Sequence, residues 1–262
     1  MSAKILIVGC GAIGGLFAAT LSSVAKVTAL DANAEHVEAI RARGLQVDGK
    51  NPRVVQIEAT CDPTALRDTR FDAVIFLIKS KMTAAALSQL QPVLAGNPPL
   101  VTLQNGIGNA EVLLSASEAV VIRGVTMNAA RYVDAGRVES LIEGKTWLGP
   151  ARGNVADVRP LADLLNKGGM ETEVVGDPMG AVWSKFVFNC VMNPLGALMM
   201  GDNASRYDAP EMRALIDEMA AECTAVVEGL GGKFAFPPMD YVREVRAGEA
   251  RRSRHAGSMA LD

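Results

Sequence analysis

The amino-acid sequence predicts an α/β fold in which an N-terminal domain with a parallel sheet is followed by an all-helical C-terminal domain. Short apolar runs rich in β-branched residues alternate with helix-length segments in the first half of the chain, as is typical of parallel strands buried on both faces. From Val155 onward helical patterns dominate. The 262 residues exceed what one small core usually holds, so we expect two domains.

The chain opens with a strand, a glycine-rich turn and a helix. Ala3–Val8 is the apolar strand, and the alanine-rich segment that ends near Ser23 is the helix. Lys26–Leu30 predicts a second strand, and Asn33 is a suitable N-cap for a helix that ends at Arg43. Together these elements form a βαβα unit.

The strands that follow are of two kinds. Turn residues at the centre of Leu45–Ile57 predict a hairpin or a pair of short strands, and Gly136 within Tyr132–Glu139 predicts another hairpin. The continuous apolar runs predict buried parallel strands at Phe71–Ile78, Leu100–Leu103 and Val120–Ile122, and Trp147–Pro150 closes a later strand.

The C-terminal part predicts long helices. Asp177-Pro178 is a good helix start, Gly180–Met200 is a long segment that we expect to kink at Pro194, and Ala209–Gly229 is another long helix. We therefore expect a dinucleotide-binding domain over residues 1–176 and a helical substrate and dimerisation domain over residues 177–262.

Composition excludes several classes of protein. The 26 Lys plus Arg against 29 Asp plus Glu give a net charge of −3, which argues against a nucleic-acid binder. Four scattered cysteines and two histidines indicate neither a metal site nor a disulfide framework, and they fit a reducing cytoplasm. The longest apolar stretch is interrupted by Asn189, Asn193 and Pro194, and the start carries no targeting pattern, so we expect no membrane span.

A glycine-rich loop directly follows the first strand and opens the first helix. Its G-x-G-x-x-G residues are Gly9, Cys10, Gly11, Ala12, Ile13 and Gly14. In this context the glycines allow a tight turn, a close approach to a pyrophosphate and helix–strand packing, and the helix N-terminus attracts phosphate. The pattern predicts Rossmann-type dinucleotide binding, and the alternative is a tight turn without a ligand.

Asp31 stands at the end of the second strand, where an acidic side chain accepts hydrogen bonds from an adenosine ribose. A carboxylate there repels a 2′-phosphate, whereas Arg41 and Arg43 lie at the far end of the next helix, so the cofactor preference leans toward NADH. The alternative is that Asp31 merely begins a turn.

Two polar residues follow later buried strands. Lys79 comes after Phe71–Ile78, and Asn105 lies in a glycine-containing turn after Leu100–Leu103. Ligands of open α/β sheets bind at these carboxyl ends, so both side chains are candidates for cofactor or substrate contacts. For each, an ordinary solvated loop residue is the alternative.

Lys185, Asn189 and Asn193 recur every four residues within an otherwise apolar helix, which places them on one flank. Polar groups in an apolar surround need partners, and a ligand carbonyl or carboxylate would supply one. The alternative is a structural polar ladder that bonds to a neighbouring helix.

These residues together resemble the ketopantoate reductase family (2-dehydropantoate 2-reductase), whose members reduce a 2-keto acid to its 2-hydroxy acid with NADPH in the pantothenate pathway. The resemblance runs from Lys4 to the chain end. It is carried by Gly9–Gly15, Lys79, Gln104–Gly108, Trp183–Lys185 and Asn189–Leu195.

The resemblance implies a role at each matching position. Lys185 is similar to the catalytic lysine of the family, and Asn105 to the asparagine between nicotinamide and substrate. Lys79 is similar to a cofactor-side lysine. Asn189 and Asn193 match substrate-pocket asparagines, and Ser258 resembles a serine that binds the carboxylate end of the substrate. A homodimer formed through the helical domain is also implied.

Two departures from the family pattern affect these expectations. The family carries a glutamate and further helix beyond Ser258, so the helical domain is expected to be incomplete at its C-terminus. The family also has a basic residue after the second strand, where this sequence has Asp31-Ala32-Asn33. The cofactor is therefore NADPH by family norm or NADH by the Asp31 argument.

The functional hypothesis is NAD(P)H-dependent reduction of a small-molecule 2-keto acid, foremost 2-dehydropantoate in pantothenate and coenzyme A biosynthesis. Lys185 would donate a proton as the alkoxide develops, and Asn105 would orient the reacting groups. The alternatives are an NADH-linked dehydrogenase for another branched or aromatic 2-hydroxy acid and a dinucleotide-binding sensor without turnover.

Overall fold

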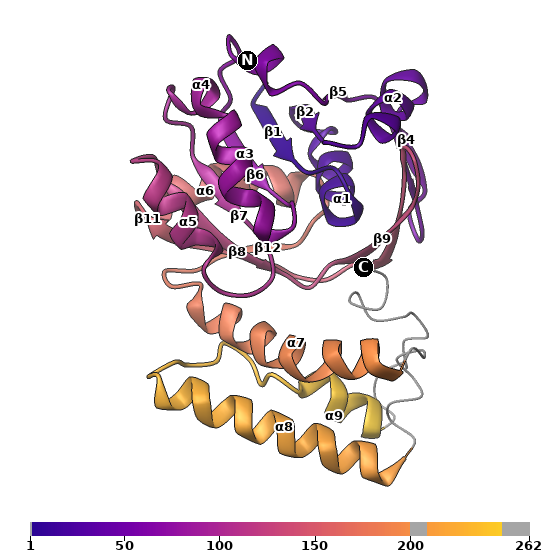
Figure 1. The fold of residues 1–262 in the computed structure, drawn as a ribbon, viewed down its shortest axis with the longest axis vertical. Helices are drawn as coiled ribbons and strands as arrows, with labels where there is room; N and C mark the ends of the chain where they lie inside the picture. The colour runs from indigo at the N-terminus through magenta and orange to yellow at the C-terminus, as the bar shows by residue number, and fades with distance from the viewer. Residues whose placement is uncertain (1, 200–208, 248–262) are drawn as a thin grey trace. The chain divides into compact units, whose positions relative to one another are not determined.

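The computed structural model describes residues 2–199 and 209–247, and these divide between two compact units, Met1–Pro178 and Met179–Asp262. Each unit is described by itself below. The first unit is α/β and the second is helical (Figure 1). This arrangement confirms the predicted fold class.

The main sheet of the first unit has eight strands among the described residues, in the order β12-β11-β8-β7-β6-β1-β2-β5. Neighbouring strands are parallel except for β8 and β11, which are antiparallel. Its strands are β1 (Lys4–Val8), β2 (Lys26–Leu30), β5 (Glu58–Thr60), β6 (Ala73–Phe76), β7 (Leu100–Thr102), β8 (Val121–Thr126), β11 (Thr146–Arg152) and β12 (Thr172–Val174).

The helical segments of this unit connect the strands (Figure 1). They are α1 (Ala12–Leu21), α2 (Ala34–Arg43), η1 (Pro63–Leu66), η2 (Ser80–Met82), α3 (Thr83–Gln89), α4 (Gln91–Leu94), α5 (Asn109–Ala116) and α6 (Val155–Lys167). Asn33 caps α2 as predicted, because its side chain accepts a hydrogen bond from the amide of His36.

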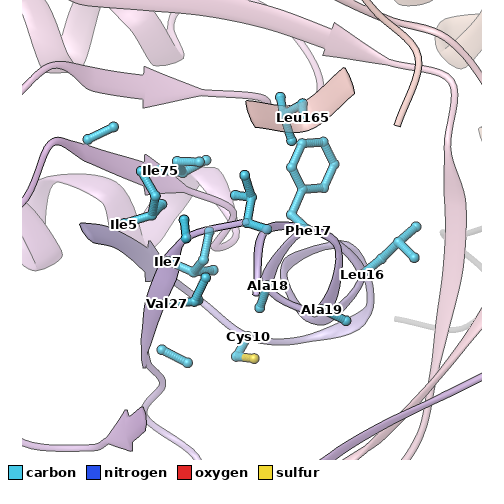
Figure 2. Packing of buried hydrophobic residues seen from close by; sticks show 14 of the residues in the cluster. Ile5, Ile7, Cys10, Leu16, Phe17, Ala18, Ala19, Val27, Ile75 and Leu165 are labelled. Carbon is cyan, nitrogen blue, oxygen red and sulfur yellow. The ribbon is translucent and has the colours of Figure 1, made fainter. Parts of the chain in front are cut away.

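Both faces of the main sheet are buried. Alternate residues of β1 point to opposite faces. Ile5 and Ile7 point into a core shared with α1 and α6, whereas Leu6 and Val8 point into a second core shared with α3, α4 and α5. Figure 2 shows the first core, where Phe17 of α1 points toward Leu165 of α6. This double burial explains why the strands read as continuous apolar runs.

A smaller sheet of four strands among the described residues, in the order β4-β3-β10-β9, packs beside α1. Its strands are β3 (Leu45–Asp48), β4 (Arg53–Val55), β9 (Ala129–Asp134) and β10 (Arg137–Ile142). Each predicted hairpin is confirmed as an antiparallel pair, β3 with β4 and β9 with β10. The parallel pairing of β3 with β10 joins the two hairpins, and the sequence did not predict it.

The second unit contains α7 (Met179–Met199), α8 (Pro210–Gly229) and α9 (Asp240–Ala247). Their shared core is built on Val191, Leu195, Ile216 and Val242. Figure 1 shows α8 running alongside α7. The helix α7 is continuous through Pro194.

Several elements went unpredicted, among them β5, β12 and α9. The strand β12 lies in the region where only helical patterns were expected, β5 extends the main sheet after the first hairpin, and α9 follows α8. The strands β5 and β12 are three residues long, too short to show a period, and they exist because a neighbouring strand provides hydrogen bonds. No helix in the described part of the chain is both long and apolar enough to cross a membrane.

Candidate dinucleotide and substrate site

The loops that carry the predicted cofactor residues lie side by side at one edge of the main sheet. Six parallel strands stand side by side in the order β5, β2, β1, β6, β7 and β8. If these six are numbered along the chain, the order across the sheet is 3-2-1-4-5-6, which is the Rossmann order. In such sheets dinucleotides bind where the strand order reverses, which is between β1 and β6 here. The strands β2, β1, β6 and β7 are adjacent, so the loops at their carboxyl ends are neighbours.

The glycine-rich loop after β1 needs its glycines for steric reasons. Gly9 has φ +89°, and a Cβ there would lie 2.5 Å from Cγ2 of Ile78, just beyond β6. A Cβ on Gly14 would lie 1.8 Å from the carbonyl oxygen of Gly9. A Cβ on Gly11 would meet nothing within 4 Å, so the backbone at Gly11 faces open space.

This loop fits a dinucleotide pyrophosphate. Gly11 is the N-cap of α1 and has no side chain to accept the first amides of the helix. Those amides belong to Ala12, Ile13 and Gly14, and both Ala12 and Ile13 are partly exposed. Free amides and the helix dipole attract phosphate, and the space beside Gly11 lets a ligand approach the backbone.

The carboxylate of Asp31 is fixed by two backbone amides. Its Oδ2 accepts a hydrogen bond from the amide of Cys10 at 2.7 Å, and its Oδ1 accepts one from the amide of Asn33 at 2.9 Å. The side chain is half-buried at the end of β2. Asp31 therefore contacts the glycine-rich loop directly, which sequence spacing alone did not indicate.

Cys10 belongs to the loop through its backbone, while its side chain is part of the core (Figure 2). Burial, with a smaller contribution from the Asp31 carboxylate, raises the pKa of the Cys10 thiol to about 12. The thiol is therefore neutral at physiological pH and carries no chemistry of its own.

Lys79 and Asn105 lie in the loops after β6 and β7, and Gln104 ties these loops together. The Gln104 side-chain amide donates to the carbonyl of Ile78 at 2.8 Å and to the hydroxyl of Thr83 at 2.9 Å. Its Oε1 accepts from the hydroxyl of Thr102 at 2.9 Å. Lys79 itself is exposed and is the N-cap residue of η2.

Asn105 is exposed in the turn that precedes α5. Gly106 and Gly108 follow it with φ +88° and +91°, conformations that favour glycine. The buried Asn109 side chain donates to the carbonyl oxygen of Asn105 at 3.0 Å. This bond holds the backbone of Asn105, so its side-chain amide is presented from a fixed position.

In the second unit, Lys185 lies on α7 and is half-buried. Burial lowers the pKa of its ammonium to about 8, because desolvation disfavours the charged form. The preceding residue, Ser184, is fully buried, and its hydroxyl bonds to the carbonyl oxygens of Gly180 and Phe236. These bonds anchor the segment after α8 against α7, next to Lys185.

Asn189 and Asn193 are half-buried and follow Lys185 at intervals of four on the continuous helix α7, so the three share a flank. Ser258 lies outside the described residues. The candidate residues therefore form two groups, one at the carboxyl edge of the main sheet and one on α7. Within the described residues, no group of three or more His, Cys, Asp or Glu side chains could hold a metal ion.

Sequence reasoning missed three residues that hold these groups in place. Gln104 was noticed only as part of a motif, His36 as one of two histidines, and Ser184 only as part of the Trp183–Lys185 block. Each of them also has a hydrogen-bond partner that is distant in the chain, at separations of 21, 100 and 52 residues respectively. No local pattern signals a hydrogen bond over that separation.

A largely parallel sheet in this strand order, with a glycine-rich loop at its switch point, is the Rossmann-type arrangement typical of dinucleotide-binding proteins. Residues 5–153 match the family model "Ketopantoate reductase PanE/ApbA", and residues 177–262 match the model of its C-terminal region. The chain therefore belongs to the ketopantoate reductase family.

Relatives of known name agree with this membership. The chain is 31% identical over 238 residues to 2-dehydropantoate 2-reductase of Pyrococcus horikoshii, covering 90% of this chain and 77% of the relative. It is 32% identical over 265 residues to the enzyme of the same name from Halobacterium salinarum, covering 99% and 85%.

Solved structures share the fold. The PanE/ApbA family ketopantoate reductase from Ralstonia eutropha JMP134 matches with a TM-score of 0.87 at 27% identity, covering 99% of this chain and 84% of that one. D-Mandelate dehydrogenase in a ternary structure with NADH and anilino(oxo)acetate matches with a TM-score of 0.89 at 21% identity and the same coverage.

Proposed function

We propose that this protein reduces 2-dehydropantoate to pantoate, the reductase step of pantothenate and coenzyme A biosynthesis. Family membership supports the reaction type, and relatives that are 31% and 32% identical carry the name of this enzyme. The observation that carries the mechanism is Lys185, a half-buried lysine whose pKa is lowered to about 8 on a helix flank shared with Asn189 and Asn193.

The proposed acid is the Lys185 ammonium. When bound, a reduced nicotinamide would supply a hydride for C2 of the 2-keto acid, and the ketone oxygen would need a proton. The Lys185 ammonium hydrogen-bonds that oxygen and transfers a proton to it, so that the alcohol and a neutral amine result. A pKa of about 8 is close to the operating pH, which is where general acids work best.

The other residues bind and orient. Gly9, Cys10, Gly11, Ala12, Ile13 and Gly14 hold the pyrophosphate through backbone amides, and Lys79 contributes a positive charge on the cofactor side. Asn105 orients the carbonyl and the nicotinamide through its amide, from a backbone held by Asn109. Asn189, Asn193 and Ser258 bind the remaining polar groups of the substrate.

For the cofactor we propose NADH over NADPH, although NADPH is the family norm. Asp31 supports this choice, because its carboxylate is held at the end of β2 by the amides of Cys10 and Asn33. A fixed negative charge there attracts ribose hydroxyls and repels a 2′-phosphate.

A second candidate function is an NADH-linked dehydrogenase for another branched or aromatic 2-hydroxy acid. The same Asp31 carboxylate favours it, because it departs from the basic residue that the family carries at this position. A third candidate is a sensor that binds the cofactor without turning it over.

One assay separates these candidates. The loss of absorbance at the reduced-nicotinamide band is followed with NADH and with NADPH, using 2-dehydropantoate and a panel of branched and aromatic 2-keto acids. Oxidation that depends on 2-dehydropantoate, with NADH preferred, is the expected result. A larger kcat/KM with another 2-keto acid supports the second candidate, and cofactor binding without oxidation supports the sensor.

A further inference from the structure

His36 is a buried histidine with both ring nitrogens engaged. The side chain is 1% exposed and lies in the first turn of α2. Its Nδ1 accepts a hydrogen bond from the amide of Gly136 at 2.8 Å, and its Nε2 lies 2.9 Å from the carbonyl oxygen of Cys10. An amide can only donate and a carbonyl can only accept, so the ring is neutral with its proton on Nε2.

These bonds join three separate parts of the first unit. Cys10 lies in the glycine-rich loop, His36 in α2, and Gly136 in the turn between β9 and β10 of the smaller sheet. The ring of Tyr132 on β9 packs against His36 with the ring centroids 5.1 Å apart. His36 thus links the turn of the smaller sheet to the loop through one hydrogen bond on each side.

Two side chains hold the backbone of Cys10, one at its amide and one at its carbonyl. Asp31 accepts its amide hydrogen, and His36 donates to its carbonyl oxygen. The residues on either side, Gly9 and Gly11, are glycines that lose much conformational entropy on ordering. A loop held at Cys10 is ordered before a ligand binds, so the free-energy cost of ordering the loop is not subtracted from the binding free energy.

We propose that His36 is a positioning residue for the dinucleotide-binding loop, and that it couples the β9–β10 turn to cofactor affinity. His36 does not touch the cofactor in this proposal. It fixes the orientation of the Cys10 carbonyl, and through it the peptide units that lead into α1. The inference rests on dinucleotide binding by the glycine-rich loop, as in the proposed function.

The test compares His36→Phe with His36→Gln in the full-length protein. Phenylalanine keeps an aromatic ring of slightly larger volume but leaves the Cys10 carbonyl and the Gly136 amide without partners. Glutamine retains a donor near the Nε2 position. We expect His36→Phe to raise the Kd for NADH roughly tenfold, with kcat at saturating NADH within about twofold of wild type. His36→Gln should recover most of the lost affinity.

Tyr132→Ala is the matched control, because it removes the ring that packs on His36 and leaves both hydrogen bonds. It should bind NADH like the wild type. The inference is overturned if folded His36→Phe, verified by circular dichroism, has the wild-type Kd, or if Tyr132→Ala weakens binding as much as His36→Phe does.

Gly136→Ala tests the coupling from the other end and keeps the inference falsifiable if His36→Phe does not fold. Gly136 has φ +73°, and a Cβ there would lie 3.0 Å from Cβ of Ala39, so alanine displaces the amide from His36. We expect a several-fold higher Kd for NADH. In a double-mutant cycle with His36→Phe the two effects should be non-additive. A wild-type Kd for Gly136→Ala contradicts the coupling.

The wild-type protein is titrated first with NADH and NADPH. Absence of binding to either dinucleotide overturns both this inference and the proposed function. Binding without turnover of any 2-keto acid contradicts the proposed function alone, and the effect of His36→Phe on Kd still decides this inference.

Discussion

At the scale of single residues, the environment decides which candidates carry chemistry. Lys185 is half-buried and Cys10 is buried, and burial lowers the pKa of the lysine but raises that of the thiol, because it disfavours the charged form of each. The lysine can therefore exchange a proton near neutral pH, and the thiol cannot. Asp31 has a third role, because its charge is fixed by amides of the loop it adjoins.

The activity should follow the titration of Lys185. Reduction needs the ammonium, so kcat/KM for the 2-keto acid should fall as pH rises through about 8, and oxidation of the 2-hydroxy acid should rise over the same range. Lys185→Ala should lower turnover at pH 7 by roughly 10²- to 10⁴-fold while cofactor binding persists. The measurement is a pH–rate profile in both directions.

Lys233→Ala is the control for this prediction, because Lys233 is an exposed lysine of the same unit. It should keep the wild-type rate and profile. Near-full activity of Lys185→Ala would show that another group supplies the proton.

Asp31 variants should separate cofactor preference from loop integrity. Asp31→Asn removes the charge and keeps an acceptor, so the ratio of kcat/KM for NADPH to that for NADH should rise roughly tenfold, equivalent to about 1.4 kcal/mol. Asp31→Arg should raise the ratio as well, but both efficiencies should fall, because the amides of Cys10 and Asn33 lose their acceptor. Steady-state kinetics with both cofactors provide the ratio.

Asp68→Asn, an exposed aspartate in the same unit, is the matched control for charge. It should leave the ratio unchanged. An unchanged ratio in Asp31→Asn would mean that Asp31 does not face the ribose.

At the scale of elements, the site depends on side chains that tie loops of neighbouring strands together. Gln104 joins the ends of β6 and β7, and His36 joins the β1 loop to the β9–β10 turn. The strands place these loops next to each other, and the polar side chains fix their conformation. The half-buried Gln104 side chain bonds to Ile78, Thr83 and Thr102, and the buried His36 ring has a partner at each nitrogen, as polar groups away from water need.

Gln104→Glu should disturb Lys79 and Asn105 together. The variant is nearly isosteric, but it places a carboxylate oxygen against the carbonyl of Ile78 and loses the donors to Ile78 and Thr83. We expect kcat/KM to fall roughly 10- to 100-fold, consistent with leaving a buried polar group unpaired. Gln89→Glu adds the same charge at an exposed position of α3 and should have no effect. A wild-type kcat/KM for Gln104→Glu would show that this link does not position the site.

At the scale of the whole molecule, the two units have separate cores. The two large clusters of the main sheet are built within residues 5–170, and the cluster of α7, α8 and α9 is built within residues 191–245. The expected cofactor residues lie in the first unit and the proposed acid in the second. Cofactor binding and turnover should therefore be separable.

A fragment of residues 1–178 should fold and bind NADH without oxidising it. Its sheet is covered on both faces by its own helices, and the glycine-rich loop is complete. The fragment should unfold cooperatively by circular dichroism and bind NADH with a Kd within about tenfold of the full chain. A fragment that folds but does not bind would place an essential cofactor contact in the second unit.

The sequence by itself determined the strands and helices with strong periods, the glycine-rich loop, the two hairpins and the family. These features depend on neighbours within a few residues in the chain, so local sequence patterns are enough to predict them. The short strands β5 and β12 were not predicted, because three residues are too few to show a period and the strands depend on hydrogen bonds to their neighbours. The roles of Asp31, Lys79, Asn105, Lys185, Asn189, Asn193 and Ser258 stay predictions.

Only the tertiary structure decided which residues hold these candidates in place. The parallel pairing of β3 with β10 joins hairpins that are far apart in sequence, and the bond from Gly136 to His36 spans 100 residues. The bond from Gln104 to Ile78 spans 26. Such contacts form because the sheet brings distant strand ends together, and a polar side chain buried there needs whichever partner the fold provides.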